Sequence, residues 1–369
     1  MTWREWADGE TADIHAAGQW RAPRDLDAAG PEGKLAPDGR PVVSFASNDY
    51  LGLTQHPSVI AAAHAALDRW GTGAGSARLI VGSRPIHSEL EQALADWKHM
   101  ERAVLFPTGF ATNLGVITTF AGPGAFVVSE ELNHASIIDG CRLARAEVVV
   151  SRHADAAHVE DLLGSSNAER KVVVTDSVFS MDGDVAPIDD LTEICARHGA
   201  LLLVDEAHAV LGPSPSYEGV DVIRIGTLSK TLGALGGFAA GPTNLCDLIV
   251  NRARSYIFTT APTPADAAAA MAALAVLRSV EGDTLRARLG AHVERLRPGH
   301  PSQIVPVVIG EERATLDAAA ALLEEGMLVP AIRPPTVPPG TSRLRVALSA
   351  AHTDAQVDAL GSALERLAS

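Results

Sequence analysis

The chain has 369 residues, 47% hydrophobic and 20% charged, a composition that excludes a disordered chain and a small disulfide-stapled peptide. Its 45 acidic and 30 basic residues give a formal net charge of −15, which argues against a general nucleic-acid-binding protein, because phosphate contacts need clustered Lys and Arg. Only four of the basic residues are lysines, so chemistry that needs a primary amine has four candidates: Lys34, Lys98, Lys171 and Lys230.

The cysteines and the N-terminus indicate the compartment. Cys141, Cys195 and Cys246 form no C-x-x-C pair and no multi-bridge framework, which favours a reducing compartment. Residues 1–8 carry acidic side chains where a secretory signal would have its apolar stretch. The longest apolar stretch, residues 267–277, is shorter than the roughly 20 residues that span a bilayer. We therefore expect a cytoplasmic protein with no membrane or nucleic-acid partner.

In chain order, Pro and Gly residues first cluster between residues 22 and 41, which separates an N-terminal arm, residues 1–40, from the main body. Beyond the arm, apolar segments of strand length alternate with longer helical patterns. This alternation predicts an α/β fold with a mostly parallel central sheet covered by helices, in a large domain over residues 41–260. Its predicted strands are residues 103–106, 125–129, 147–151, 171–175, 201–204 and 221–225.

Pro262 and Pro264 precede an Ala-rich helical segment that begins a smaller C-terminal α/β domain, residues 261–369. The elements predicted in it are strands over residues 303–309 and 343–348 and helices over residues 314–325 and 354–367. We find no repeated period along the chain.

Polar residues follow several predicted strands directly. Ser180 follows the strand 171–175, Asp205 and His208 follow 201–204, and Lys230 follows 221–225. Because ligands of open α/β sheets bind at the carboxyl ends of the strands, we expect these side chains to meet at one rim. The strand 103–106 leads into a Gly turn, Thr108-Gly109, that opens a helix and whose backbone N–H groups can hold a phosphate.

Other interpretations of these motifs are weaker. The Asp205-Glu206-Ala207-His208 box also occurs in nucleic-acid ATPases, but the sequence has no G-x-x-x-x-G-K-[ST] phosphate loop. No further Cys/His pair accompanies the box at metal-ligand spacing, so we expect no metal. The glycine-rich segment 71–75 follows a helical stretch instead of a strand, which favours a pocket loop over a dinucleotide site.

The parts at the rim match what pyridoxal phosphate requires. That cofactor needs an amine for a Schiff base, a buried Asp against its ring nitrogen, and a helix N-terminus with hydroxyls for its phosphate. A lone Lys after a strand is often a solvated surface residue. Lys230, however, lies among glycines, which indicates close backbone approach to a ligand.

Six short segments resemble the α-oxoamine synthase family of pyridoxal phosphate-dependent enzymes and occur in that family's order from about residue 40 onward. They are residues 47–53 (SNDYLGL), 108–113 (TGFATN), 133–136 (NHAS), 178–184 (VFSMDGD), 204–208 (VDEAH) and 227–230 (TLSK). The segment 331–345 (AIRPPTVPPGTSRLR) is most similar to the biotin-pathway branch of the family. The resemblance implies an aminotransferase-like fold of type I.

The resemblance also implies roles for single residues around the cofactor. Lys230 would hold the cofactor, Asp205 would pair with its ring nitrogen and His208 would hydrogen-bond its phenolic oxygen. His134 would stack over the ring and orient the substrate, so that Lys230, His134 and Asp205 form the catalytic set. The remaining cofactor contacts implied by the family are Gly109, Phe110 and Thr227 around the phosphate and Ser180 along the site.

In the family the phosphate also receives a hydroxyl from the neighbouring subunit, for which Thr259 or Thr260 is the matching position. The resemblance therefore implies a homodimer with shared active sites. The substrate contacts that it implies are Asn48, Arg333 and Arg345 for an amino-acid carboxylate, Thr336, His134, and Arg21 on the acyl or CoA side. Taken singly, His134 could cap a helix, Asn48 and Ser180 could satisfy turns, and Arg345 could form a surface ion pair.

The implied reaction is the condensation of L-alanine with a pimeloyl thioester, on CoA or a carrier protein, to give 8-amino-7-oxononanoate, CO2 and a free thiol. A sister activity would use glycine or serine with another acyl thioester, and a degenerate family member would only bind or assemble. One departure bears on the acyl group: after His208 the family has A-x-G-x-x-G, whereas the segment 209–217 is shorter. The acyl chain length therefore stays open.

Overall fold

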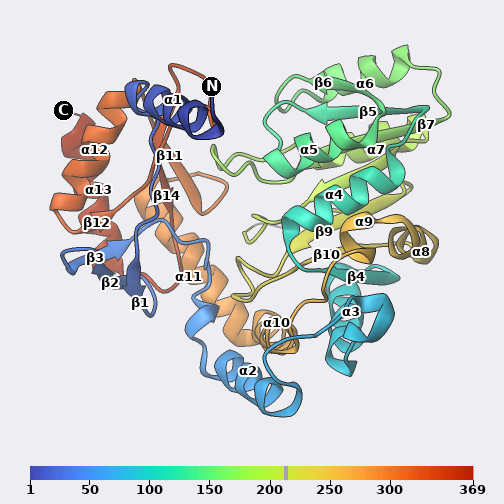
Figure 1. Ribbon diagram of the computed structural model, residues 1–369, viewed down its shortest axis with the longest axis horizontal. Helices are drawn as coiled ribbons and strands as arrows, with labels where there is room; N and C mark the ends of the chain where they lie inside the picture. The colour runs from blue at the N-terminus through green and yellow to red at the C-terminus, as the bar shows by residue number, and fades with distance from the viewer. Residues whose placement is uncertain (212–214, 369) are drawn as a thin grey trace. The chain divides into compact units, whose positions relative to one another are not determined.

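The computed structural model describes residues 1–211 and 215–368 (Figure 1). Residues 212–214, which belong to the shortened segment 209–217, therefore lie outside the described residues. The chain divides into two compact units. One unit comprises Met1–Ala46, Pro306–Val346 and Ala359–Ser369, and the other comprises Ser47–Val305 and Ala347–Asp358. This division differs from the predicted boundaries after residues 40 and 260. The N-terminal arm joins the C-terminal region in one unit because a parallel strand pair, Val43 with Met327, links them.

The larger unit is built on a seven-stranded sheet in the order β4-β10-β9-β8-β7-β5-β6. Its strands are β4 (Arg102–Phe106), β5 (Ala125–Glu130), β6 (Glu147–Ser151), β7 (Arg170–Asp176), β8 (Leu201–Asp205), β9 (Val222–Thr227) and β10 (Gly237–Gly241). Every strand predicted between residues 103 and 225 is present, and the mostly parallel sheet is confirmed. The strand β10 was missed, and it runs antiparallel to both of its neighbours, β4 and β9.

Alternating side chains of the strands fill two hydrophobic cores, one on each face of the sheet. Val172, Val174 and Leu203 belong to the first core, and Val173 and Leu202 belong to the second. Four helices pack on the first face, namely α4 (Gly109–Phe120), α5 (Ala135–Ala144), α8 (Thr243–Arg252) and α9 (Arg254–Ile257). Two pack on the second, α6 (Ala156–Ser165) and α7 (Ile188–His198). With both faces covered, the sheet leaves its strand ends as the place for polar chemistry.

The helices of this unit begin where the sequence supplies caps. Thr108, Asp155, Thr263 and Ser279 each accept a backbone N–H at a helix start. The helices are α2 (Pro57–Trp70), α3 (Pro85–Lys98), α4 (Gly109–Phe120), α5 (Ala135–Ala144), α6 (Ala156–Ser165), α7 (Ile188–His198), α8 (Thr243–Arg252), α9 (Arg254–Ile257), α10 (Pro264–Leu277) and α11 (Val280–Leu296), with shorter turns η1 (Leu53–Gln55) and η2 (Arg78–Gly82). The helix α10, expected in the C-terminal domain, packs against α2 and α3 because its Ala-rich surface allows close contact on several sides.

The smaller unit holds two short sheets. One has the order β1-β2-β3-β12 and the other β11-β14-β13. The elements are α1 (Trp3–Ala16), β1 (Leu26–Ala28), β2 (Glu32–Leu35), β3 (Arg40–Ser44), β11 (Ile304–Gly310), α12 (Glu312–Glu324), β12 (Met327–Leu328), β13 (Ala331–Ile332), β14 (Ser342–Ala347) and α13 (Asp354–Ala368). The predicted strands 303–309 and 343–348 and both predicted helices of this region are therefore confirmed.

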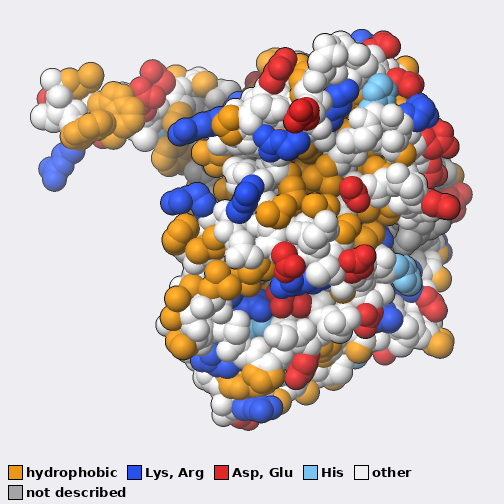
Figure 2. Space-filling view, turned by 90° about the vertical axis from the view of Figure 1, so that its right-hand side faces the viewer, with side chains coloured by type: hydrophobic (Ala, Val, Ile, Leu, Met, Phe, Trp, Pro, Cys, Tyr) orange, Lys and Arg blue, Asp and Glu red, His pale blue; other side chains and the backbone are white. Residues whose placement is uncertain are grey.

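The surface carries charges of both signs. On the face shown in Figure 2, Lys and Arg side chains are interspersed with Asp and Glu. Within the described residues, no helix is both long and apolar enough to cross a bilayer.

Candidate active site

The carboxylate of Asp205 lies at the end of β8 and is held by neutral donors. Asp205 is 6% exposed. Its Oδ2 accepts a hydrogen bond from Asn113 Nδ2 at 2.7 Å, and its Oδ1 accepts one from the backbone N–H of Ala207 at 2.8 Å. Asn113 is itself buried on α4. Since both recorded donors are uncharged, the negative charge of Asp205 is available to a cationic partner.

A chain of hydrogen bonds leads from Asn113 to His134. Asn113 Nδ2 also donates to Ser136 Oγ at 2.9 Å, and Ser136 Oγ lies 2.7 Å from His134 Nδ1. His134 caps α5 through that nitrogen, while its backbone N–H donates to Asp176 Oδ2 at 2.7 Å. Burial of the imidazole lowers the pKa of His134, and the negative charge of Asp205, which acts to raise that pKa, does not outweigh it. The residue as a whole remains exposed. Ser136 thus holds the His134 ring at the start of α5, and Asn113 connects Ser136 to Asp205.

His208 joins Lys230 to the segment of residues 47–53. Lys230 Nζ lies 2.8 Å from His208 Nε2, and the Tyr50 hydroxyl lies 2.6 Å from His208 Nδ1. The Tyr50 hydroxyl donates to Asn48 Oδ1 at 2.9 Å. Because a hydroxyl has one proton to donate, His208 Nδ1 must donate to Tyr50, which leaves Nε2 to accept from the Lys230 amine.

Gly109 and Thr227 meet at the start of α4. A Cβ placed on Gly109 would lie 3.2 Å from the Thr227 Cβ, and a Cβ on Gly237 would lie 2.6 Å from the Gly109 nitrogen. Thr227 Oγ1 lies 2.7 Å from Ser229 Oγ. The glycines therefore let three backbone segments converge at a helix N-terminus flanked by hydroxyls, which is a suitable place for a phosphate.

Phe110 lies next to this start, and its ring centroid is 6.5 Å from that of His134 in an edge-on arrangement. The ring of Phe110 thus connects the proposed phosphate end of the site to the imidazole that was predicted to stack on the cofactor. Phe110 is 45% exposed, so it borders the site instead of belonging to the core.

Ser180 lies in a turn that the Gly183 N–H closes onto the Phe179 carbonyl at 2.8 Å. Ser177, at the start of this turn, donates its backbone N–H and its hydroxyl to the Asp205 carbonyl at 2.8 and 3.0 Å. The turn that carries Ser180 is therefore tied to the strand end that carries Asp205.

Several supporting residues were missed by sequence reasoning. Asn133 donates to the Val174 carbonyl at 2.8 Å and accepts the Asp176 N–H at 2.9 Å, which joins the His134 loop to β7. Burial raises the pKa of Asp176 well above its usual range, and the charge of Asp205 adds to this shift. Asn133 lies inside the motif segment 133–136 and Asp176 lies just before the segment 178–184, and this position in the sequence could have identified them as site residues.

His153 was missed as well. Its Nδ1 lies 2.6 Å from Glu130 Oε1 and its Nε2 lies 2.5 Å from Asp184 Oδ2. Glu130 also accepts the Leu132 N–H at 2.6 Å. His153 therefore links the loop before His134 to the turn of Ser180, although its own segment carries no motif that would have singled it out.

The remaining predicted residues lie elsewhere. Thr260 is exposed after α9. The predicted residues of the smaller unit lie in segments that hydrogen bonds join: Arg333 donates to the Gly18 carbonyl at 2.6 Å, Arg21 donates to the Pro334 carbonyl at 3.2 Å, and the Thr336 N–H donates to the Arg333 carbonyl at 3.0 Å. Arg345 is buried on β14 in the same unit. Their substrate contacts stay predictions.

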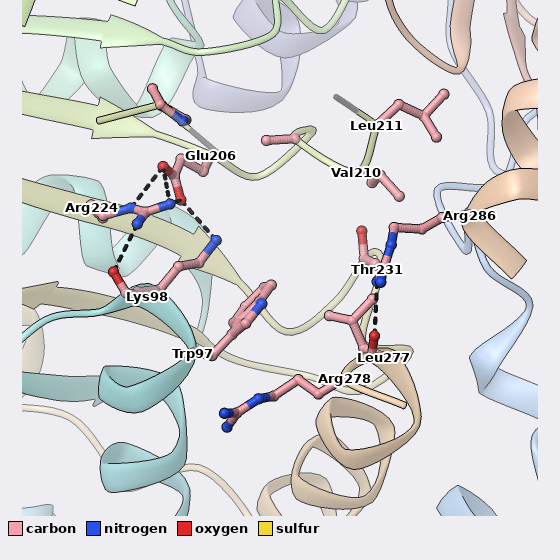
Figure 3. A pocket seen from close by; sticks show the side chains of 12 residues that line it. Trp97, Lys98, Glu206, Val210, Leu211, Arg224, Thr231, Leu277, Arg278 and Arg286 are labelled. Carbon is pink, nitrogen blue, oxygen red and sulfur yellow. Dashed lines mark hydrogen bonds and ion pairs between the residues drawn. The ribbon is translucent and has the colours of Figure 1, made fainter. Parts of the chain in front are cut away.

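Glu206, next to Asp205, is occupied by cations, which argues against a metal at the Asp205-Glu206-Ala207-His208 box. Its carboxylate lies 2.8 Å from Lys98 Nζ and 2.8 Å from an Arg224 nitrogen (Figure 3). The Tyr217 hydroxyl also donates to it at 3.0 Å. Burial alone would raise the pKa of Glu206, but Lys98 and Arg224 outweigh it and lower that pKa.

The donor set fits pyridoxal phosphate. An amine, an uncompensated buried carboxylate and a hydroxyl-flanked helix start lie on the ends of β8, β9 and the helix that follows β4. In addition, Asn113, whose amide donates to Asp205, has a buried Oδ1 with no hydrogen-bond partner among the described residues. Unpaired buried oxygens are costly, and one at this position is consistent with a site shaped for a further polar group.

Comparisons with known proteins agree with this chemistry. The aminotransferase class I and II family matches residues 40–364. An 8-amino-7-oxononanoate synthase from Anaeromyxobacter dehalogenans is 48% identical over 98% of this chain and 94% of the relative, and one from Burkholderia thailandensis is 46% identical over 96% and 95%. A solved serine palmitoyltransferase from S. paucimobilis, with a bound PLP–myriocin aldimine, has a TM-score of 0.92 at 31% identity and covers 100% of this chain and 98% of that one.

Proposed function

Because the chain belongs to the aminotransferase class I and II family and, within it, to the α-oxoamine synthases, we propose that it condenses L-alanine with a pimeloyl thioester and releases CO2 and a free thiol. The product would be 8-amino-7-oxononanoate, a step of biotin biosynthesis. The observation that carries this proposal is the 48% identity to an 8-amino-7-oxononanoate synthase over nearly the full length of both chains.

Pyridoxal phosphate supplies a ring that withdraws electrons from the Cα atom of a bound amino acid. Lys230 would bind this cofactor through Nζ, and the Asp205 carboxylate would hold the proton on the ring nitrogen. The start of α4 at Gly109 and the Thr227 hydroxyl would bind the phosphate. Each of these roles follows from the charge and donors that the residue presents.

The proton on Cα needs a base close by. The Lys230 amine, when it does not hold the cofactor, would be the base that accepts that proton. His208 would orient Nζ, because its Nε2 lies 2.8 Å from Nζ and can accept a hydrogen bond from it. The other ring nitrogen of His208, Nδ1, is hydrogen-bonded to Tyr50. His134 would lie over the ring and orient the substrate.

We propose substrate-binding roles for the residues to which the family resemblance assigns them. Asn48, Arg333 and Arg345 would bind the amino-acid carboxylate and so fix which Cα bond is aligned to break. Thr336 would contact substrate, and Arg21 would bind on the acyl side. We further propose a cytoplasmic homodimer in which Thr260 of one subunit reaches the phosphate of the other.

Product mass tests the proposal. Purified holoenzyme is incubated with L-alanine, glycine or L-serine and with pimeloyl-CoA, palmitoyl-CoA or pimeloyl carrier protein. We expect 8-amino-7-oxononanoate from L-alanine with a pimeloyl donor, and no turnover with L-alanine would overturn the proposal. The similarity to serine palmitoyltransferase favours a second candidate, a sister enzyme, whose signature would be a product formed from serine and palmitoyl-CoA.

A borohydride experiment tests the cofactor residue independently of the substrates. Reduction of the holoenzyme followed by peptide mass spectrometry is expected to find the trapped adduct on Lys230. An adduct on Lys34, Lys98 or Lys171 would overturn the assignment. A purified protein without a visible absorption band would instead support a degenerate member that only binds or assembles.

A further inference from the structure

A cavity of about 420 Å³ lies beside Glu206 in the larger unit (Figure 3). Its walls come from the end of α3, the segments after β8 and β9, the end of α10 and the start of α11. The lining residues used below are Trp97, Lys98, Val210, Leu211, Arg224 and Arg278. A cavity of this volume is in the range that binds small molecules.

The deep end of the cavity has more positive than negative charge. Lys98 and Arg224 face the single carboxylate of Glu206, and the three side chains are 7%, 5% and 3% exposed. Two buried cations against one carboxylate leave a positive charge away from water, which is unfavourable unless a further anion is present. Consistent with this, burial lowers the pKa of Lys98 in spite of Glu206.

Lys98 also has hydrogen-bonding capacity to spare. Its ammonium group carries three N–H donors, and the acceptor recorded for them within the described residues is Glu206. The Nζ atom lies 3.7 Å from the centroid of the Trp97 ring. The ammonium group of this cavity-lining residue therefore has N–H donors beyond the one that Glu206 accepts.

The rim of the cavity adds further cations and an apolar wall. Arg286 is held by the Leu277 carbonyl at 2.8 Å and by Asp283. The Arg278 guanidinium, at the end of α10, has no hydrogen-bond or ion-pair partner within the described residues, and it extends toward Trp97 in Figure 3. Val210 and Leu211 form an apolar part of the lining.

We propose that this cavity is a second binding site, separate from the site at Lys230, and that it takes a small organic carboxylate. The anionic group would lie between Lys98 and Arg278, and the apolar body would pack on Trp97, Val210 and Leu211. The ligand would touch segments that directly continue the active site, since Glu206 follows Asp205 and Thr231 follows Lys230. This proposal does not depend on which acyl thioester the enzyme uses.

Calorimetric titration of the holoenzyme tests the site, with hexanoate as the probe. We expect saturable binding of one hexanoate per chain, weaker binding of inorganic phosphate, which has no apolar body, and no binding of hexylamine. Arg278→Gln should weaken hexanoate binding about threefold to tenfold, because it removes one charged hydrogen-bond partner from an exposed rim. Lys98→Met should weaken it further.

Arg252→Gln is the matched control, since Arg252 is an exposed arginine on α8 that does not line the cavity. It should bind hexanoate like the unmodified protein. An absence of saturable binding up to roughly 10 mM hexanoate would overturn the proposal. Unchanged binding in Arg278→Gln and Lys98→Met would do the same, because hexanoate would then occupy another site. Phosphate binding as tight as hexanoate would exclude the apolar part of the proposed site.

Discussion

Two neighbouring carboxylates, Asp205 and Glu206, are both buried but have opposite surroundings. Neutral groups donate to Asp205, namely the Asn113 amide and the Ala207 N–H. Glu206 lies between two cations, Lys98 and Arg224. A carboxylate that the protein already neutralises contributes to stability, whereas one that it leaves uncompensated can serve a cationic ligand. We therefore expect Glu206 to stabilise the fold and Asp205, the adjacent residue, to take part in the chemistry of the site.

The largest effect should come from removing the charge of Asp205. Asp205→Asn keeps the size of the side chain, so we expect the cofactor to bind still, while turnover falls by about 10² to 10³-fold because the ring nitrogen loses its counter-charge. Steady-state kinetics with cofactor content measured by absorbance checks this. Turnover equal to that of the unmodified protein at full cofactor content would refute the role of Asp205.

Glu206→Gln should act on stability instead. It would leave Lys98 and Arg224 buried without a counter-ion, at a cost of about 3–5 kcal/mol in the free energy of unfolding. Urea unfolding measures this cost. Glu160→Gln is the control, since its ion pair with Arg197 is exposed and should contribute less than about 1 kcal/mol. A large loss of turnover per folded molecule with unchanged stability would contradict the comparison.

Tyr50→Phe sharpens the comparison on the catalytic side. The hydroxyl of Tyr50 accepts a hydrogen bond from His208 Nδ1 and donates one to Asn48, so its loss would release the imidazole that is hydrogen-bonded to Lys230. We expect kcat to fall about tenfold, the equivalent of one buried hydrogen bond, with a changed pH profile. If KM rose while kcat and the pH profile stayed the same, Tyr50 would act on substrate binding and not through His208.

The sequence predicts best those strands and site residues that depend on a few consecutive residues. The strand before Asp205 and the strand before Lys230 follow from short apolar runs, and the chemistry follows from the polar residues after them. The strand β10 was missed because Gly237-Phe-Ala-Ala-Gly is short and rich in glycine. The glycines near Lys230 predict close approach to a ligand, and the structure shows that one of them, Gly237, also lets β10 lie against the start of α4.

Partners far apart in the chain were beyond the reach of sequence patterns. Tyr50 and His208 are 158 positions apart, and Asn113 and Asp205 are 92 apart. Val43 and Met327, whose parallel pairing places the N-terminal arm in the same unit as the C-terminal region, are still farther apart in the sequence. Lys98 was one of four candidate amines, and only its contact with Glu206 shows that it is engaged elsewhere.

The smallest predicted effect concerns His153, where one cation lies between two carboxylates, the reverse of the arrangement at Glu206. Burial alone would lower the pKa of His153, but Asp184 and Glu130 outweigh it and raise that pKa above its unfolded value. The stabilisation is therefore fully present below about pH 6.5, the unfolded pKa, and is lost as the pH rises through the folded pKa. Because His153 is partly exposed, His153→Gln should cost only about 1 kcal/mol at pH 6 and less at pH 9. His64→Gln, an exposed position on α2, should show no such pH dependence in urea unfolding, and a His153→Gln cost that grew toward pH 9 would exclude a charged His153 as the source of the stabilisation.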